Sequence, residues 1–226
     1  MVRIAVIVPC LNEARHIVST LSRLQYLRQN GHQLIVVDGQ STDASVALAT
    51  PLADNVVSHQ RGRALQLNHG AQITNAELLL FLHADTQLPD NADTLIIEQL
   101  AKSKRQWGRF NVRLSGKHYW LRVIEFMMNT RSRWSGIATG DQAIFVDREL
   151  FKKVGGFPEI SLMEDICLCK HLKPYSKPLC LSEPVITSSR RWEEKGIWRT
   201  ILLMWRLRLA YFLGIDTKQL KRQYDN

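Results

Sequence analysis

Three short apolar runs divide the first half of the chain. They cover residues 4–8, 34–37 and 78–82, and each one ends abruptly in polar or turn-forming residues. Runs that are this short and this continuously apolar are typical of strands buried on both faces of a parallel sheet. The pattern therefore predicts three buried parallel strands.

Helical periodicity appears between these runs. Over residues 13–28, apolar side chains recur every three or four positions, at Ile17, Leu21, Leu24 and Leu27. Asn12 is a suitable N-cap for this helix, and residues 44–49 continue as a second helix. The alternation of strands and helices predicts an α/β fold wound by right-handed crossovers.

Polar residues follow all three runs, and the carboxyl ends of parallel strands share the sheet edge where ligands bind. Asp85 follows the third run in the segment His83-Ala84-Asp85. Its carboxylate suits a hard divalent cation that is bridged to substrate phosphates. The alternative is that Asp85 only caps the next segment.

The second half of the chain is less regular. Residues 107–114 alternate as a strand does, with Arg109, Asn111 and Arg113 on one face. Residues 118–130 predict a helix whose apolar stripe belongs to the core. The stripe consists of Leu121, Ile124, Phe126, Met127 and Met128. Residues 130–140 predict a loop over the site, with strands following over 142–146 and 184–189.

Residues 197–213 form an apolar, basic tail. At helical spacing Arg199 and Arg206 share a face while Arg208 points nearly opposite, so we do not expect a cleanly two-faced helix. Trp, Leu and Arg in this proportion suit a membrane interface. Packing on the core and a homodimer contact are the alternatives.

The composition narrows the class of partner. The 226 residues carry 30 basic and 21 acidic side chains, a net charge of +9. This excess favours an anionic partner, but no P-loop, zinc-finger or RNP-type signature accompanies it, so we expect no nucleic acid.

No run of about 18 apolar residues is present, and the first strand leaves no room for a signal peptide. Four cysteines without C-x-x-C spacing indicate reduced thiols. We expect a cytoplasmic protein, or one peripheral at the inner face of the plasma membrane.

The strand-end motifs resemble the signatures of family 2 glycosyltransferases, the nucleotide-sugar-dependent enzymes with the GT-A fold. The matching segments are IAVIVPCLNEARHIVSTL, LIVVDGQSTDAS, LLFLHADTQL, GDQAIFVDRELFKKVGGFPE and MEDICLCKHL. The resemblance covers roughly residues 3–192 and narrows to a compact bacterial subgroup. It implies a Rossmann-like, mixed and mostly parallel sheet flanked by helices. The implied division is a transferase domain over 1–192, with a nucleotide-sugar half (1–100) and an acceptor half (101–192), and a helical appendage over 193–226.

The resemblance also implies a binding site for the nucleotide-sugar donor. Its residues would be Pro9, Leu11, Glu13, Asp38, Arg61, Arg63, Asn68, Ala84 and Arg191. A carboxylate such as Asp38 accepts hydrogen bonds from a base or ribose, although an Asp-Gly turn is the alternative. Arginine suits phosphate, although a solvated basic loop would also explain Arg61 and Arg63. Arg191 matches part of the Gln-x-x-Arg-Trp element of processive members, but Ser188 replaces the Gln, so we do not expect processivity.

The metal motif departs from the family at one position. The final carboxylate, Asp85, is kept, while His83 stands where a carboxylate is usual. His83 could ligate the metal, hydrogen-bond the sugar or simply end the strand. The carboxylate suits Mg²⁺ or Mn²⁺, and an imidazole ligand would be tolerated better by Mn²⁺. We therefore expect one of these two metals.

The resemblance assigns the catalytic base to Asp165 of the Glu164-Asp165 pair, with Glu164 and Asp141 next in line. A sugar hydroxyl is a poor nucleophile, so a carboxylate must accept its proton. Favourable charge at a helix N-terminus is the alternative role for this pair. The sequence thus predicts an inverting, metal-dependent transferase that uses a nucleoside-diphosphate sugar, with uridine as the expected base. Its acceptor, whether sugar, lipid or small molecule, is unidentified. The alternative is a weak or inactive donor-binding protein that has lost activity because His83 replaces the usual carboxylate.

Overall fold

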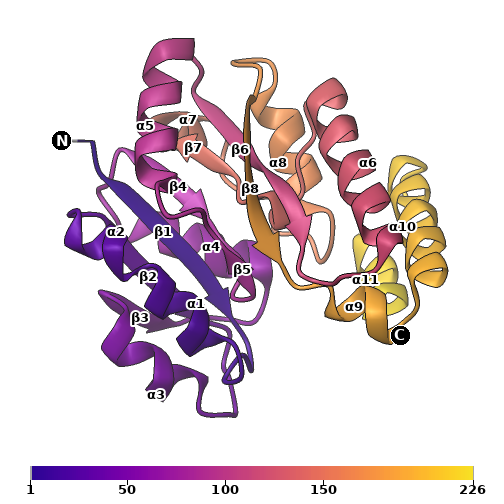
Figure 1. Ribbon diagram of the computed structural model, residues 1–226, viewed down its shortest axis with the longest axis horizontal. Helices are drawn as coiled ribbons and strands as arrows, with labels where there is room; N and C mark the ends of the chain where they lie inside the picture. Colours follow the sequence, from indigo (N-terminus) through magenta and orange to yellow (C-terminus); the bar gives the residue numbers. More distant parts are fainter. Residues whose placement is uncertain (1, 226) are drawn as a thin grey trace.

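The computed structural model describes residues 2–225 and contains an eight-stranded sheet with helices on both faces (Figure 1). The order across the sheet is β3-β2-β1-β4-β7-β6-β8-β5. The strands are β1 (Ile4–Cys10), β2 (Gln33–Asp38), β3 (Asn55–Ser58), β4 (Leu78–Phe81), β5 (Thr86–Gln87), β6 (Trp107–Leu114), β7 (Phe145–Asp147) and β8 (Leu179–Thr187). The α/β class and the mixed, mostly parallel sheet are confirmed.

The helices connect the strands and cover the sheet. They are α1 (Ile17–Arg23), α2 (Gln25–Gln29), α3 (Ser45–Ala49), α4 (Arg63–Gln72), α5 (Ala92–Ser103), α6 (Tyr119–Ser135), α7 (Arg148–Lys153), α8 (Glu164–Leu172), α9 (Arg190–Glu194), α10 (Ile197–Phe212) and α11 (Thr217–Asp225), with short 3₁₀ turns η1 (Thr50–Leu52) and η2 (Gly140–Gln142). None of the helices within residues 2–225 has the length and apolar character needed to cross a membrane.

Alternation along the central strands produces two hydrophobic layers. Val6 and Val36 pack with Leu21 of α1 on one face, while Ile7 and Val37 pack with Leu67 of α4 on the other. Successive strand residues point to opposite faces, so a strand covered on both sides must be apolar throughout. The three apolar runs are therefore β1, β2 and β4.

The carboxyl ends of the parallel strands lie at one edge of the sheet. β1 lies between β2 and β4 and is parallel to both, with Cys10 level with Asp38. β7 is antiparallel to β4 and β6, whereas β6 and β8 are parallel to each other. Two reversals restore the direction, so β4, β6 and β8 point the same way. The carboxyl ends of β1, β2, β4, β6 and β8 share this edge, and η2, which precedes β7, lies there too.

Helix α4 approaches the sheet closely at Gly70. A Cβ built there would lie 2.4 Å from Ile7 Cγ2 and 3.1 Å from Val37 Cγ2. Such distances are below ordinary van der Waals contact, so the side chain must be absent for α4 to sit at this depth. The helix thereby fixes where Arg63, its first residue, stands at the sheet edge.

Two local predictions in the first half were wrong. The helix expected over 13–28 begins at Ile17 and is interrupted at Leu24, which separates α1 from α2. Asn12 is not its N-cap: Asn12 has φ +55°, and its side chain accepts a hydrogen bond from Thr42 N at 2.9 Å. Asn12 instead ties the loop after β1 to the loop after β2.

In the second half, the structure also differs from the expected helix over 118–130 and the expected loop over 130–140. Helix α6 continues to Ser135, so most of the segment expected as a loop is helical. Gly140 begins a 3₁₀ turn, and the strand after it is confined to β7. Phe126 and Met127 are exposed, unlike Leu121 and Ile124, which are buried as expected.

The C-terminal helices pack on the rest of the molecule through one face. Leu207 of α10 and Leu220 of α11 are fully buried in a cluster with Leu162, Met163 and Ile166, around the start of α8. The alternative of packing on the core is therefore realised on the inner face of α10. The proposed boundary at residue 193 stays a prediction.

Candidate active site

Acidic and imidazole side chains gather beyond the ends of β1 and β4. Asp85 follows β4 in a turn that Thr86 N closes by donating to His83 O at 3.1 Å. Glu13 lies in the loop after β1, and its pKa is raised, first by burial and then by the negative charge of Asp85. The two carboxylates therefore face a common region at the edge predicted from the strand ends.

His83 connects this region to the turn before β7. Its Nδ1 lies 3.3 Å from Asp141 Oδ1. Its ring also lies against the backbone of Gly140, where a Cβ would come within 2.4 Å of His83 Nε2. The imidazole is thus held by Asp141, and it can occupy this place because residue 140 has no side chain. His83 does more here than end a strand.

Asp165 stands at the start of α8, next to the same turn. Its carboxylate accepts hydrogen bonds from Gly140 N at 2.8 Å and from Ile166 N at 2.7 Å. The neighbouring Glu164 is buried and lies 3.4 Å from Arg63 Nη1 of α4. Asp165, Asp141, Glu164, His83 and Arg63 therefore converge from four separate chain segments.

The environment separates the pKa values of the two aspartates. Burial, reinforced by the charge of Glu164, raises the pKa of Asp165 to about 6. Burial also acts to raise the pKa of Asp141, but the hydrogen bond from His83 and the charges of His83, Arg63 and Arg131 bring it below its ordinary value. Carboxylates whose pKa values are driven apart suit different roles. Asp165 is the better proton acceptor, and Asp141 stays ionised.

Arg131 was not selected from the sequence. Its Nε and Nη2 are buried without a hydrogen-bond partner within the described chain. Asp165 and Asp141 lie close enough for their negative charges to act on the Arg131 guanidinium. Its position in an expected loop hid its role, because only the extension of α6 brings it to the site.

Asp38 is buried at the end of β2. Its carboxylate accepts hydrogen bonds from Gln40 N and Ser41 N, each at 3.0 Å, which form the turn considered as the alternative. A contact with a nucleotide stays a prediction. Pro9 and Leu11 are half-buried at the end of the neighbouring β1, and Arg61 is exposed before α4.

Asn68 and Ala84 have local structural roles. Asn68 donates to Phe157 O at 2.8 Å and accepts from Phe157 N at 2.9 Å, so it holds the loop between α7 and α8. The buried Ala84 offers its carbonyl to Thr20 Oγ1 at 2.6 Å. Both residues shape the site through backbone positions, and direct donor contacts for them stay predictions.

Arg191 reaches the C-terminal helix. Its guanidinium lies 3.5 Å from the centroid of the Tyr224 ring and donates to the Tyr224 carbonyl. Burial raises the pKa of Tyr224, and its phenol is near Arg191 and Arg63. Helix α11 therefore comes next to the site, a placement that nothing in the local sequence indicates. Trp192 packs against the buried Leu121 and Ile124.

A divalent cation fits the carboxylates of this site only if substrate phosphates complete its coordination. Within residues 2–225, no group of three or more His, Cys, Asp or Glu side chains is placed so that it could hold a metal ion by itself. Asp85 and Glu13 nevertheless repel each other, and a cation beside them would relieve that repulsion. Mg²⁺ is commonly held by one or two carboxylates together with substrate phosphates. The residues present fit such a shared cation.

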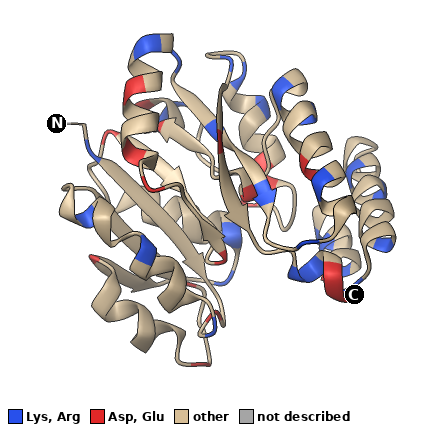
Figure 2. Ribbon diagram, in the orientation of Figure 1, with Lys and Arg blue, Asp and Glu red and all other residues tan. Residues whose placement is uncertain are grey.

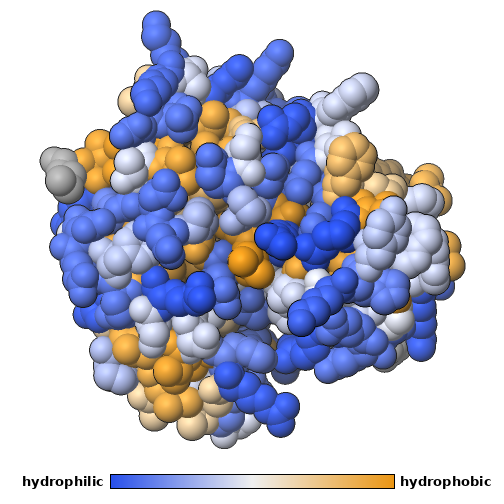
Figure 3. All heavy atoms as spheres, in the orientation of Figure 1, coloured by the Kyte–Doolittle hydropathy of each residue, from blue (hydrophilic) through white to orange (hydrophobic). Residues whose placement is uncertain are grey.

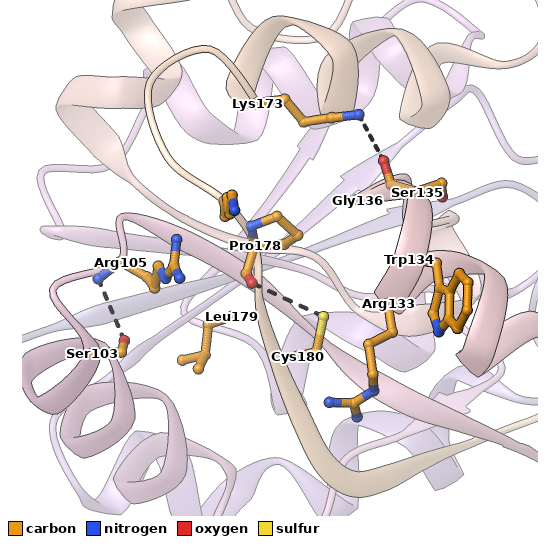
Figure 4. A pocket seen from close by; sticks show the side chains of 11 residues that line it. Ser103, Arg105, Arg133, Trp134, Ser135, Gly136, Lys173, Pro178, Leu179 and Cys180 are labelled. Carbon is orange, nitrogen blue, oxygen red and sulfur yellow. Dashed lines mark hydrogen bonds between the residues drawn. The ribbon is translucent and has the colours of Figure 1, made fainter.

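Two cavities lie at opposite edges of the sheet. A cavity of about 10 Å³, room for one water molecule, is lined by residues that include Arg63, His83, Gly140, Glu164 and Asp165. The larger cavity, 740 Å³ in volume, lies near the amino ends of β6 and β8 (Figure 4). Arg105, Arg133, Lys173 and Lys177 border it, and none of the predicted site residues does. The site described above is therefore closely packed.

The model of the family described as Glycosyl transferase family 2 matches residues 5–155, more than half of the chain. No match was found among curated proteins. Among solved structures, residues 1–349 of S. aureus TarS superpose with a TM-score of 0.67 at 17% identity, covering 83% of this chain and 60% of that one.

Two further solved structures contain bound nucleotide sugars. The complex of S. aureus TarS 1–349 with UDP-GlcNAc gives a TM-score of 0.67 at 16% identity, over 82% of this chain and 58% of that one. The mannosyltransferase PcManGT from Pyrobaculum calidifontis, in complex with GDP-Man and Mn²⁺, gives 0.66 at 23% identity, over 92% and 61%. The chain thus spans about three-fifths of the length of TarS 1–349 and of PcManGT. The likeness shows the GT-A fold that the sequence predicts.

Proposed function

Because the chain belongs to glycosyltransferase family 2, we propose that it moves a sugar from a nucleoside-diphosphate sugar to a hydroxyl acceptor with inversion at the anomeric carbon. One observation carries the proposal: Asp165, with a pKa of about 6, is held by Gly140 N–H beside the His83–Asp141 pair. Such a group is placed and tuned to accept a proton near neutral pH.

The donor would occupy the edge formed by the ends of β1, β2 and β4. Asp85 would hold Mn²⁺ or Mg²⁺, with His83 and Glu13 nearby, and the bound cation would neutralise the leaving diphosphate. Arg63, Arg131 and Arg191 are among the cationic side chains near this edge that could meet phosphate. The solved structures bound to UDP-GlcNAc and GDP-Man support a nucleoside-diphosphate donor, and a uridine donor is the form we propose.

Asp165 would remove the acceptor proton. As the acceptor oxygen forms its bond to the anomeric carbon, its proton passes to the Asp165 carboxylate, and the bond to the diphosphate breaks on the opposite face. The hydrogen bonds from Gly140 N and Ile166 N orient the carboxylate. A raised pKa makes it a stronger base than an ordinary aspartate while leaving it mostly ionised at pH 7. Asp141, paired with His83, would orient the imidazole.

The test separates catalysis from binding. Asp165→Asn keeps the shape of the side chain but cannot accept a proton. We expect donor hydrolysis, with water in place of the acceptor, to fall by about 10²–10⁴-fold, while the affinity for UDP-GlcNAc with Mn²⁺ measured by calorimetry stays unchanged. GDP-mannose serves as the comparison donor.

Other outcomes would contradict the proposal. If Asp165→Asn hydrolyses donor at the wild-type rate, the base lies elsewhere, with Asp141 or Glu164 next. If the wild type binds the donor but turns none over, with or without acceptor mixtures, the chain is a donor-binding protein.

A further inference from the structure

Helix α6 exposes a broad apolar face. Tyr119, Trp120, Phe126, Met127 and Trp134 fall within about 120° of the helix circumference at about 100° per residue. Phe126 is 69% exposed and Trp134 is 87% exposed. Side chains of this size gathered on one helix face are unusual on a free surface and mark an interaction site.

Helix α10 exposes a second apolar stripe. Trp198, Leu202, Trp205, Leu209 and Phe212 follow one another at helical spacing and fall within about 80°. Each of them is at least 57% exposed. The opposite side of α10 is already packed, since Leu207 is fully buried against Ile166 of α8. The stripe is therefore surplus to the packing of this chain.

The two stripes form one surface, which we call the α6–α10 face. The rings of Trp120 and Trp198 are in contact, with centroids 4.8 Å apart. Beneath them, Leu121 and Ile124 of α6 pack with Ile197 and Ile201 of α10. The helices lie at one side of the molecule (Figure 1), where Figure 3 shows apolar atoms at the surface.

Cations border this face. Helix α10 contains Arg199, Arg206 and Arg208 and no acidic residue, and Figure 2 shows this contrast. Around the helix axis, Arg199 and Arg206 lie about 80–100° to one side of the stripe and Arg208 about 80° to the other. The arginines flank the exposed stripe, and the buried Leu207 makes the opposite side of α10 apolar as well, so the helix is not cleanly two-faced, as its spacing predicts.

We infer that the α6–α10 face docks on an anionic lipid bilayer, with both helices lying in the interface. Tryptophan and tyrosine favour the headgroup level, the leucine and phenylalanine side chains would enter the acyl boundary, and flanking arginines would extend to anionic headgroups. A second copy of the chain fits less well, because two such faces would bring their arginines together. This surface goes beyond the proposed function and does not depend on it.

The fold also relates this face to the site. Four residues separate the end of β6 from the start of α6, and α10 begins shortly after β8 ends, so both helices start at the sheet edge that carries Asp165 and Asp85. A bilayer bound there would lie beside that edge.

Vesicle flotation with the full chain tests the inference. We expect wild type to float with phosphatidylglycerol-containing vesicles at low salt, to float much less at about 1 M salt, where screening is nearly complete, and to stay unbound with phosphatidylcholine alone. The double variant Leu202→Glu/Leu209→Glu should lower vesicle affinity by at least about tenfold, since it removes buried apolar area and adds charge. Circular dichroism checks that the variant folds.

Val46→Glu is the matched control, because Val46 is an apolar residue of α3 that is 39% exposed and outside the α6–α10 face. It should float as wild type does. The inference is overturned if wild type does not float at low salt, if Val46→Glu loses binding equally, or if wild type is a dimer that Leu202→Glu/Leu209→Glu converts to a monomer. Tryptophan emission of wild type supplies a second measurement, since it should shift to the blue with anionic vesicles.

Discussion

At the scale of single residues, the site depends on how the surroundings treat identical side chains. Asp165 and Asp141 are both aspartates near the same turn, yet burial beside Glu164 raises the pKa of the first to about 6, and His83 helps to lower the pKa of the second. Chemistry is thus assigned by neighbours that are distant in sequence.

The raised pKa of Asp165 has two opposite consequences for pH dependence. Turnover requires the ionised base, so the rate should fall as pH decreases through about 6. Stability should change in the other direction. The folded state binds this proton more tightly than the unfolded state, so its contribution is fully present below the unfolded pKa of Asp and is lost as pH rises through about 6.

A rate profile between pH 5 and pH 8, compared with melting temperatures over the same range, measures both effects. Asp165→Asn should remove this component of the pH dependence of melting. A wild-type rate that is level down to pH 5 would argue against Asp165 as the base.

Asp85 is predicted to be the metal anchor. Asp85→Ala should abolish Mn²⁺-dependent binding of UDP while the fold stays intact, because the side chain is half-buried in a turn and supports no core packing. Calorimetry with UDP, with and without Mn²⁺, is the measurement, and Asp90→Ala, an exposed site further along the chain, is the control. Equal Mn²⁺-dependent affinity in the variant and wild type would remove Asp85 from the metal site.

At the scale of secondary-structure elements, the depth of α4 is set by Gly70. Gly70→Ala places a methyl group 2.4 Å from Ile7 Cγ2, so either the helix or β1 must shift. Overpacking of this kind costs about 1–3 kcal/mol, although alanine is the better helix former. Chemical denaturation should therefore show a lower free energy of unfolding. Gln72→Ala, on the exposed side of the same helix, should have a small effect, and equal stability of the two variants would contradict the close approach.

At the scale of the whole molecule, the C-terminal helices join the body through a buried cluster. Leu220 of α11 is fully buried with Leu162, Met163 and Ile166. Leu220→Ala should cost about 2–5 kcal/mol if the helices and the transferase body unfold together. Thermal unfolding should then stay a single transition at a lower temperature, with the exposed Leu213→Ala as control. A second, earlier transition would instead support a separate appendage beginning near residue 193.

The sequence by itself determined the elements whose signal is local. An apolar run between polar ends identified β1, β2 and β4, and their shared direction placed Asp38 and Asp85 at one edge. These predictions succeeded because a strand buried on both faces leaves an unambiguous pattern in adjacent residues. Strand β6 was predicted with its observed bounds for a related reason, since polar and apolar residues alternate from Arg109 to Leu114.

Only the tertiary structure decided which residues meet across the chain. Arg131 reaches the site because α6 continues beyond residue 130, Tyr224 because α11 folds back beside Arg191, and His83 is held by the turn at Gly140. Phe126 and Met127 were expected in the core, yet both face outward, because apolar positions on a helix define faces and only packing decides which face is covered. Contacts between distant segments depend on which elements pack together, and the residues next to one another along the chain do not specify that distant partner.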